Sequence, residues 1–418
     1  MTSLRTQEAA TGTGDRSRPR AVLPALCATQ ITSWGIVYYA FPVLLPRITA
    51  ETGWSAGATT GAFSVALLIS AAAGIPVGRI LDRRGPHAVM TAGSVLATLS
   101  ILAVATASNL AVFFAAWIAA GAAMAATFYQ PAFAAVTRWW GTARVRALTV
   151  ITLAGGLAST VFAPLTAALA EHLSWRATYV VLAAILAAVT IPAHALALRA
   201  PWPPAPTAAT PHISDGRRVT RTRPFGLLAA AFTLSGFAMS AVVFGLVPLL
   251  TERGADATTA AWALGLGGAG QTLGRTLYAA LAGRTGVAAR TTALIAAGGA
   301  TTAAFALVPG PIPLLIILAV LAGVVRGNLT LLQATAVSDR WGTSAYGHLS
   351  GLLGAPVMVA AAIAPWAGAA AADALGGYPT LFAGLSAVSG MAVVLALGTG
   401  VGRPGRRGAE EHVAIDSR

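Results

Sequence analysis

The sequence contains no lysine, only one cysteine and few acidic residues. Without lysine the chain cannot contain a phosphate loop of the Gly-x4-Gly-Lys type, which excludes an ATP-driven pump built on that loop. Cys27 has no partner for a disulfide or a cysteine-based metal site within the chain. The six histidines are not clustered with acidic residues at ligand spacing. We therefore expect no metal, no cofactor and no enzymatic activity.

Long apolar runs, by contrast, recur along nearly all 418 residues, of which 56% are hydrophobic and 10% charged. A helix that crosses the hydrocarbon core needs about 20 mostly apolar residues. The runs are continuous and do not alternate as the lipid-facing strands of a barrel do, so they predict helices. We expect an all-α membrane protein with twelve transmembrane helices, at about residues 21–46, 57–80, 87–107, 110–136, 145–170, 176–198, 224–250, 258–281, 289–308, 312–336, 344–370 and 378–401.

The positions of the arginines predict the orientation of these helices. All 27 basic residues are arginines, and with the N-terminus inside, 22 of them fall at cytoplasmic positions. Only Arg47, Arg176 and Arg253 fall outside. Such a bias predicts a multi-pass protein of the plasma membrane with both termini in the cytoplasm. Because the net charge of +14 follows from this topology, we expect the lipid bilayer and no nucleic acid as partner.

A proline- and arginine-rich stretch divides the chain. Residues 199–223 contain five prolines and five arginines, which predicts a cytoplasmic linker. On either side we expect a six-helix bundle, 21–198 and 224–401. The first 20 residues lack the apolar core of a secretory signal, so we expect a disordered cytoplasmic tail at 1–20 and a second cytoplasmic tail at 402–418.

The two expected bundles resemble each other in sequence. A shift of 201 residues aligns Trp140-Gly141-Thr142 with Trp341-Gly342-Thr343, Arg83 with Arg284, and Pro164 with Pro365. The shared offset indicates a duplication. Because each half has an even number of helices, the halves are expected to be parallel, related by an axis along the membrane normal, with a substrate site between them near the midplane.

The junction of the second and third expected helices carries a recognisable motif. Gly78-Arg79-Ile80-Leu81-Asp82-Arg83-Arg84-Gly85 resembles the loop signature of the major facilitator superfamily, a glycine followed after three residues by Asp-Arg-x-Gly. The resemblance covers about residues 21–401. It implies a transporter of two pseudo-symmetric six-helix bundles.

Within that superfamily, two further segments resemble the monocarboxylate and oxalate/formate transporter branch. They are Gly53-Trp54-Ser55 at the start of the second helix and Gly274-Arg275 within the eighth. The resemblance implies that Arg275 binds a substrate carboxylate. The chain departs from the oxalate/formate carriers in the eleventh helix, where it has Leu352 and Leu353 in place of a lysine.

Two arginines inside expected helices are the main candidates for substrate binding. An arginine at the bilayer centre costs about 2.5–3.5 kcal/mol on insertion scales and usually faces a cavity or a partner. All thirteen acidic residues fall in tails, loops or helix ends, so an anionic substrate would be the counter-ion. The alternative is that each arginine binds backbone carbonyls of neighbouring helices. The candidate substrate-binding residues are Arg275 with Gln271 and Tyr278 on one helix face, Arg326 with Thr330 and Gln333 on another, and Tyr38 and Tyr129.

The loop motif is expected to act mechanically. Asp82 is placed to accept hydrogen bonds at the start of the eleventh helix, near Thr343 and Ser344, where the helix dipole favours an anion. Arg138 would hold the same carboxylate. Such a latch, formed by Gly78, Asp82, Arg83, Gly85 and Arg138, would join the halves on the cytoplasmic side of the outward-open state. The alternative is a solvated loop charge that sets orientation.

These features together favour a secondary transporter. A receptor would need a sizeable soluble domain, for which the short loops leave no room. We expect a monomer that moves a small organic anion such as a monocarboxylate by alternating access, with a coupling ion that the sequence does not identify. The alternative is an exporter of drugs or secondary metabolites, because Gly155-Gly156 and Ala163-Pro164 partly match the fifth-helix signature of such exporters.

Overall fold

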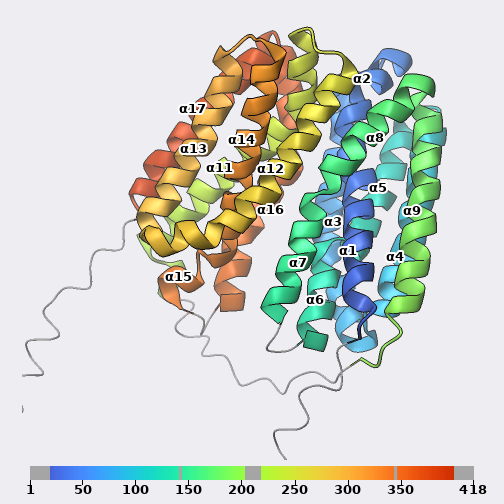
Figure 1. The fold of residues 1–418 in the computed structure, drawn as a ribbon, viewed down its shortest axis with the longest axis horizontal. Coiled ribbons are helices and arrows are strands. Elements are labelled where there is room, and N and C mark those ends of the chain that lie inside the picture. The colour runs from blue at the N-terminus through green and yellow to red at the C-terminus, as the bar shows by residue number, and fades with distance from the viewer. Residues whose placement is uncertain (1–18, 141–143, 203–217, 343–345, 400–418) are drawn as a thin grey trace, which may run out of the picture.

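The computed structural model describes residues 19–140, 144–202, 218–342 and 346–399. Every regular element in these ranges is helical, as the apolar runs predict. Figure 1 shows two groups of helices side by side. The first group, the N-terminal half, consists of α1 (Val22–Ser33), the π-helix η2 (Trp34–Tyr39), α2 (Ala40–Thr52), α3 (Ala56–Arg84), α4 (Pro86–Thr106), α5 (Leu110–Thr127), α6 (Tyr129–Trp140), α7 (Arg144–Gly156), α8 (Ala158–His172) and α9 (Trp175–Ala197).

The second group, the C-terminal half, follows residues 203–217, which lie outside the described ranges together with most of both expected tails. Its helices are again long, apart from one short helix before α16. They are α11 (Arg223–Glu252), α12 (Ala257–Arg284), α13 (Val287–Leu307), α14 (Ile312–Thr335), α15 (Ser338–Trp341), α16 (Tyr346–Leu375) and α17 (Tyr378–Leu397).

Nine helices within the described residues are long and apolar enough to cross a membrane. They match nine of the twelve expected segments. The other three segments are helical but are not long and apolar enough by this criterion. Val22–Thr52 is divided into three shorter elements. The helices α12 and α13 are rich in glycine and threonine, which lowers their hydropathy. Many large apolar side chains of the spanning helices are exposed, among them Leu99 and Ile317, as lipid-facing residues would be.

Three expected helices are interrupted where the sequence pattern is continuous. The first contains the π-helix η2, the fourth breaks at Phe128, whose backbone is extended, and the fifth breaks at Leu157 between α7 and α8. At these breaks the backbone conformation is determined by the packing of neighbouring side chains and not by the helical propensity of the apolar run. Gly35 in η2, for example, lies directly against the ring of Phe162 of α8, with no room for a Cβ atom.

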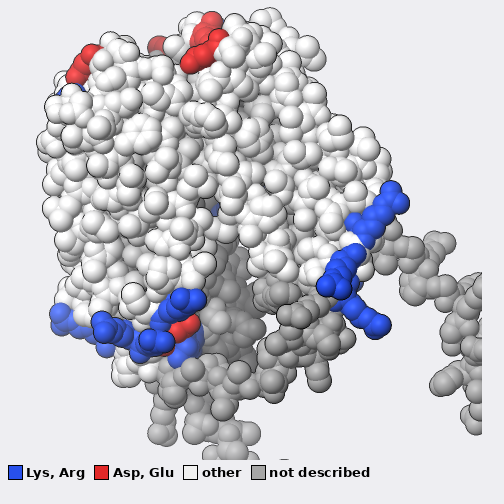
Figure 2. Space-filling model, turned by 180° about the vertical axis from the view of Figure 1, so that it is seen from behind, with Lys and Arg blue, Asp and Glu red and all other residues white. Residues whose placement is uncertain are grey.

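Charged residues collect at the two ends of the helices (Figure 2). One end, the arginine-rich end, carries Arg79, Arg83, Arg84, Arg138, Arg284 and Arg340. The opposite end, the acidic end, carries Glu51, Glu171, Glu252, Asp256 and Asp373. At the acidic end Asp256 begins α12 and accepts hydrogen bonds from the backbone N–H and the hydroxyl of Thr259, at 2.8 and 2.7 Å. These bonds hold the pKa of the Asp256 carboxyl below its ordinary value.

The two halves contact each other along α3 with α16 and α8 with α12. Toward the acidic end, the Ser64 hydroxyl accepts from the backbone N–H of Trp366 at 3.1 Å. The Thr160 hydroxyl donates to the carbonyl of Gly265 at 2.9 Å, and the Thr258 hydroxyl donates to Glu171. Figure 1 shows the lower ends of α7 and α16 as separate ribbons at the arginine-rich end. The hydrogen bonds named above therefore join the halves toward the acidic end.

A buried ion pair stabilises the C-terminal half near its arginine-rich end. Nη2 of Arg290 in α13 lies 2.7 Å from Oδ2 of Asp339 in α15, and only 4% of the Arg290 side chain is exposed. Nη1 of Arg290 donates to the carbonyls of Ala282 and Thr285 at 3.3 and 3.0 Å. The guanidinium also lies over the ring of Tyr278, 5.5 Å from its centroid. Removing Asp339 would leave a buried cation without its carboxylate.

We expect Asp339→Ala to lower the free energy of unfolding by about 3 kcal/mol, because Arg290 keeps only neutral partners. The measurement is thermal unfolding of the purified protein in detergent. Asp82→Ala is the matched control: its ion pair with Arg138 is 3.9 Å long and the Asp82 side chain is 71% exposed. That control should change stability by less than about 1 kcal/mol. Equal losses in the two variants would contradict this account of the Arg290–Asp339 pair.

Candidate functional site

A cavity of about 120 Å³ lies between the two halves. We call it the arginine cavity. From the N-terminal half, the π-helix η2 contributes three aromatic side chains. From the C-terminal half, α11, α12 and α14 contribute apolar, amide and guanidinium groups. Its lining residues are Trp34, Tyr38, Tyr39, Met239, Ser240, Val243, Gln271 and Arg326.

Arg326 is the charged group of this cavity. Its Nε and Nη2 atoms are buried and have no hydrogen-bond partner. No carboxylate among the described residues forms an ion pair with it. Tyr38 from the opposite half lies close enough to interact with it electrostatically. A half-buried cation that lines a cavity and has no carboxylate partner is a candidate site for an anion, because charge-assisted bonds to a guanidinium are strong.

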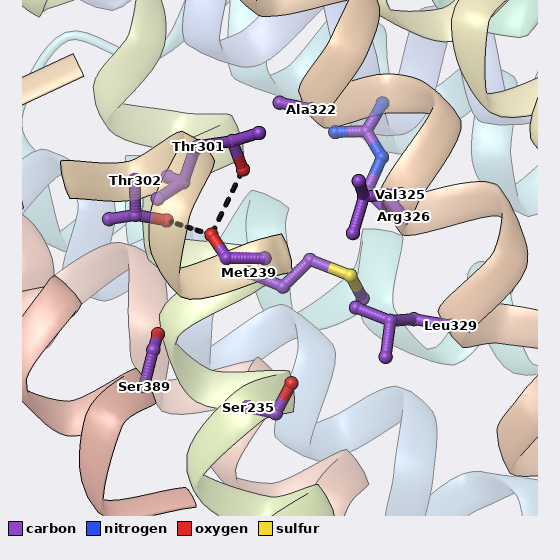
Figure 3. Close-up of a pocket in the computed structure, with 11 residues that line it drawn as sticks. Ser235, Met239, Thr301, Thr302, Ala322, Val325, Arg326, Leu329 and Ser389 are labelled. Atoms are coloured by element: carbon purple, nitrogen blue, oxygen red, sulfur yellow. Dashed lines mark hydrogen bonds between the residues drawn. The ribbon is translucent and has the colours of Figure 1, made fainter. Parts of the chain in front are cut away.

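A smaller pocket of about 40 Å³ lies on the other side of Arg326, within the C-terminal half (Figure 3). Its threonine hydroxyls are already engaged: Thr301 and Thr302 both donate to the carbonyl of Gly298 at 2.9 Å. The Ser389 hydroxyl likewise donates to the carbonyl of Leu385 at 2.9 Å. These three groups therefore offer lone pairs, not protons, to the pocket. The arginine cavity is therefore the better candidate site for an anion.

Arg275 has a different environment from Arg326. It is 8% exposed, and its Nη1 donates to the backbone carbonyl of Thr152 in α7, so it crosses from one half to the other. A Cβ atom on Gly156 would lie 2.9 Å from this Nη1, so a larger residue there would displace the end of the Arg275 side chain. Tyr129 lies close enough to interact electrostatically with Arg275. For Nη1, the structure thus shows the alternative in which the arginine binds a backbone carbonyl of a neighbouring helix. The Nε atom of Arg275 has no hydrogen-bond partner.

The remaining candidates divide into two sets. Gln271, one turn before Arg275, lines the arginine cavity together with Tyr38 and Arg326. Tyr278 instead bonds the Thr335 hydroxyl at 2.7 Å within the C-terminal half. The Thr330 hydroxyl donates to the carbonyl of Arg326 at 2.9 Å, and Gln333 lines a separate pocket of about 150 Å³ beside Phe232 and Val357. The polar stripe on α14 is therefore not a single surface of one cavity.

Trp34 and Tyr39 were not among the candidates from the sequence. Both lie in η2, where the wider π-helical turn brings Trp34, Tyr38 and Tyr39 to the same cavity. A helix of ordinary pitch would spread residues 34, 38 and 39 differently, and π-helical turns are frequent at functional sites. The only signal in the sequence is the cluster of aromatic residues within one apolar run.

The loop motif forms a contact that involves a tryptophan after α9. Arg138 and Asp82 are 3.9 Å apart, and the Arg138 guanidinium lies 4.9 Å from the ring centroid of Trp202. The indole N–H of Trp202 donates to the carbonyl of Asp82 at 3.2 Å. Gly85 ends α3 with a φ of 78° and packs against Trp202, which explains the glycine there.

Two other residues of the motif, Gly78 and Arg83, lack such close contacts in the structure. Gly78 has open space where a Cβ atom would be, and Arg83 is exposed. The expected partners of Asp82 at the start of the eleventh helix, Thr343 and Ser344, lie outside the described residues.

Comparison with known sequences adds to this picture. A sequence model of the Major Facilitator Superfamily matches residues 26–313. Monocarboxylate transporter 13 of Bos taurus is 26% identical over 257 residues, which are 60% of this chain and 57% of that protein. The uncharacterized MFS-type transporter YcxA of Bacillus subtilis (strain 168) is 26% identical over 185 residues, 42% of this chain and 44% of that protein. The chain thus matches about half the length of these curated relatives.

Solved structures share the fold at low identity. A bacterial homologue of the human lysosomal transporter Spinster, in an inward-facing and unoccupied conformation, has a TM-score of 0.74 at 14% identity, covering 92% of this chain and 98% of that one. The nucleoside transporter NupG has a TM-score of 0.73 at 13% identity, covering 92% of this chain and all of that one. These likenesses support the fold.

We expect Gly35→Ala to destabilise the protein by about 1–3 kcal/mol, because the new methyl group would meet the Phe162 side chain, whose Cβ lies only 2.8 Å away. Gly226→Ala in α11 is the control, since no atom lies within 4 Å of its added Cβ. Thermal unfolding in detergent measures both. Adding Gly35→Ala to Phe162→Ala should cost less than adding it to the parent, because Phe162→Ala removes the Cγ and Cδ2 atoms that the new methyl group meets. Unchanged stability of Gly35→Ala would contradict the close packing of η2 on α8.

Proposed function

Because the chain belongs to the Major Facilitator Superfamily, we propose that it moves a small organic anion across the plasma membrane by alternating access. The family confirms the resemblance of the loop motif at Gly78–Gly85 and makes the protein a multi-pass membrane transporter. The observation that carries the anion proposal is Arg326, which lines a cavity between the halves and whose buried Nε and Nη2 have no hydrogen-bond partner.

The charge balance of the interior supports an anionic substrate. The described acidic residues lie at the helix ends, and the three ion pairs among the described residues involve neither Arg275 nor Arg326. A carboxylate would satisfy the planar guanidinium of Arg326 with two parallel bonds. The curated relative named as a monocarboxylate transporter supports the same substrate class.

We assign different roles to the two arginines. Arg326 binds the carboxylate, and Tyr38 and Gln271 beside it complete the polar part of the site. Arg275 lies one turn beyond Gln271 and contacts Thr152 of the opposite half, so it responds to the relative position of the halves. Tyr129 accompanies Arg275 in this role.

The described conformation fits one state of an alternating-access cycle. Hydrogen bonds between the halves run from the acidic end to Arg275. With the arginine-rich end in the cytoplasm, as the positive-inside rule predicts, these bonds favour the inward-open state. In the opposite state, closure of the arginine-rich end would bring the Asp82–Arg138 pair toward the start of the eleventh helix, where the latch would form.

The first test of this proposal separates the two arginines. With labelled monocarboxylates, Arg326→Gln should abolish both binding in detergent and uptake into proteoliposomes, and Arg326→Lys should weaken both, because an ammonium group lacks the planar fork. Arg275→Gln should keep ligand binding in detergent but slow uptake, since it removes the contacts with Thr152 and Tyr129 and leaves the residues that line the arginine cavity unchanged. Thr276→Val, an exposed neighbour on α12, is the control.

Two results would overturn these assignments. Loss of binding in Arg275→Gln with normal binding in Arg326→Gln would make Arg275 the carboxylate ligand. Export of a cationic dye by the parent protein without any anion transport would replace the organic anion with the drug or metabolite exporter as the function.

The second test concerns the latch. Asp82→Asn should slow transport severalfold while leaving ligand binding intact, because it shifts a conformational equilibrium and does not alter the cavity. Its folded yield should match the parent, since Asp82 is 71% exposed. If Asp82→Asn instead lost ligand binding and retained the parent's cycling rate, the latch role would be wrong.

A further inference from the structure

A second and larger cavity lies next to the arginine cavity. Its volume is about 320 Å³, and α3, α5, α6 and η2 of the N-terminal half and α16 of the C-terminal half enclose it. We call it the aromatic pocket. Most of its surface is apolar, and Trp34, Tyr38, Phe128, Tyr129, Leu67 and Met358 contribute its large side chains. Nothing in the assignments above uses this volume.

The aromatic pocket adjoins the arginine cavity that Arg326 lines. Trp34 and Tyr38 line both the aromatic pocket and the arginine cavity. A molecule whose carboxylate meets Arg326 would therefore pass these two rings to enter the aromatic pocket. One end of the combined site is cationic and the other is apolar.

The rings of the pocket are held in place by buried hydrogen bonds. The indole N–H of Trp34 donates to the side-chain oxygen of Gln30 at 3.2 Å, and the Gln30 amide donates to the carbonyl of Thr127 at 2.7 Å. Gln30 is fully buried. Trp34 also stacks on Phe128, with ring centroids 4.2 Å apart and an interplanar angle of 24°. Since the N–H of Trp34 is already satisfied, the indole offers the pocket its apolar surface.

The size of the pocket excludes a close fit to the smallest carboxylates. Ligand sites of about 300–1,000 Å³ enclose drug-sized molecules, and acetate would leave most of this pocket empty. Offset-stacked or edge contacts between aromatic rings contribute favourable free energy in addition to that from burying their surface area. We propose that the substrate is an amphipathic aromatic monocarboxylate, with its carboxylate on Arg326 and its ring in the aromatic pocket. This inference rests on the proposed anion transport.

The probes that test it are indole-3-acetate and acetate. Binding to the purified protein in detergent, followed by thermal shift or competition, should show an affinity at least about tenfold higher for indole-3-acetate, because ring burial adds to the shared carboxylate contact. Equal affinities for the two probes in the parent protein would overturn the aromatic substrate and leave the anion proposal standing.

A pair of neighbouring variants tests the location of the ring. Ala71→Phe places a ring inside the aromatic pocket, which Ala71 lines, and should remove the advantage of indole-3-acetate over acetate. Ala72→Phe adds the same ring at the next position on α3, which is exposed, and should preserve that advantage. Ala71→Val serves if Ala71→Phe does not fold, with a smaller loss expected. An unchanged advantage in a folded Ala71 variant would place the ring elsewhere and overturn the inference.

Arg326→Gln distinguishes failure of this inference from failure of the proposed function. It should abolish the binding of both probes if Arg326 holds the carboxylate. If neither probe binds to the parent protein, the proposed anion transport fails, and the aromatic substrate fails with it.

Discussion

A cation held inside an apolar bundle without a carboxylate partner is the constraint on which the central site depends. Arg326 lies on α14 with two buried guanidinium nitrogens unpaired, while the described carboxylates remain at the helix ends. An arginine in the membrane interior is tolerated where it faces water, a cavity or a counter-ion. The arginine cavity provides that space, and an anionic substrate would provide the missing charge. Charge balance at the midplane therefore changes with substrate occupancy.

The two halves share a scaffold but contribute different chemistry. Aromatic rings from η2 enter the cavity from one side, and the guanidinium of Arg326 with the amide of Gln271 enters from the other. The ion pairs near the arginine-rich end also differ between the two halves. Asp82 is exposed and loosely paired with Arg138, whereas the Arg290–Asp339 pair is short and buried. Under the 201-residue shift Arg138 aligns with Asp339, so the charge at this repeat position is reversed. The second pair is buried within its half, whereas the first is longer and more exposed.

Composition and charge pattern predicted more of the fold than of the site. Apolar runs predict helices reliably because the bilayer requires long apolar segments with internal hydrogen bonding. The helical spacing of Gln271 and Arg275 predicts a shared helix face, yet of the two only Gln271 lines the arginine cavity. What the pattern could not predict depends on contacts between distant segments. The π-helical turn that brings Trp34 to the cavity needs the Gly35–Phe162 contact, and the bond from Arg275 to Thr152 needs the small Gly156 opposite.

Each of the three ion pairs among the described residues lies within one half, and this bears on how the halves can separate. Arg275 joins α12 to α7 through the backbone carbonyl of Thr152, one turn beyond the cavity toward the arginine-rich end. A hydrogen bond from a charged donor contributes about 1.5–3 kcal/mol, whereas breaking a buried ion pair costs about 3–5 kcal/mol. A transporter that rocks its halves about the substrate site breaks the contacts on one side of that site as contacts on the other side form. A guanidinium bonded to a neutral carbonyl can therefore close the interface beside the substrate and still separate from that carbonyl when the halves move. A buried Arg–carboxylate pair at the same place would separate far more slowly.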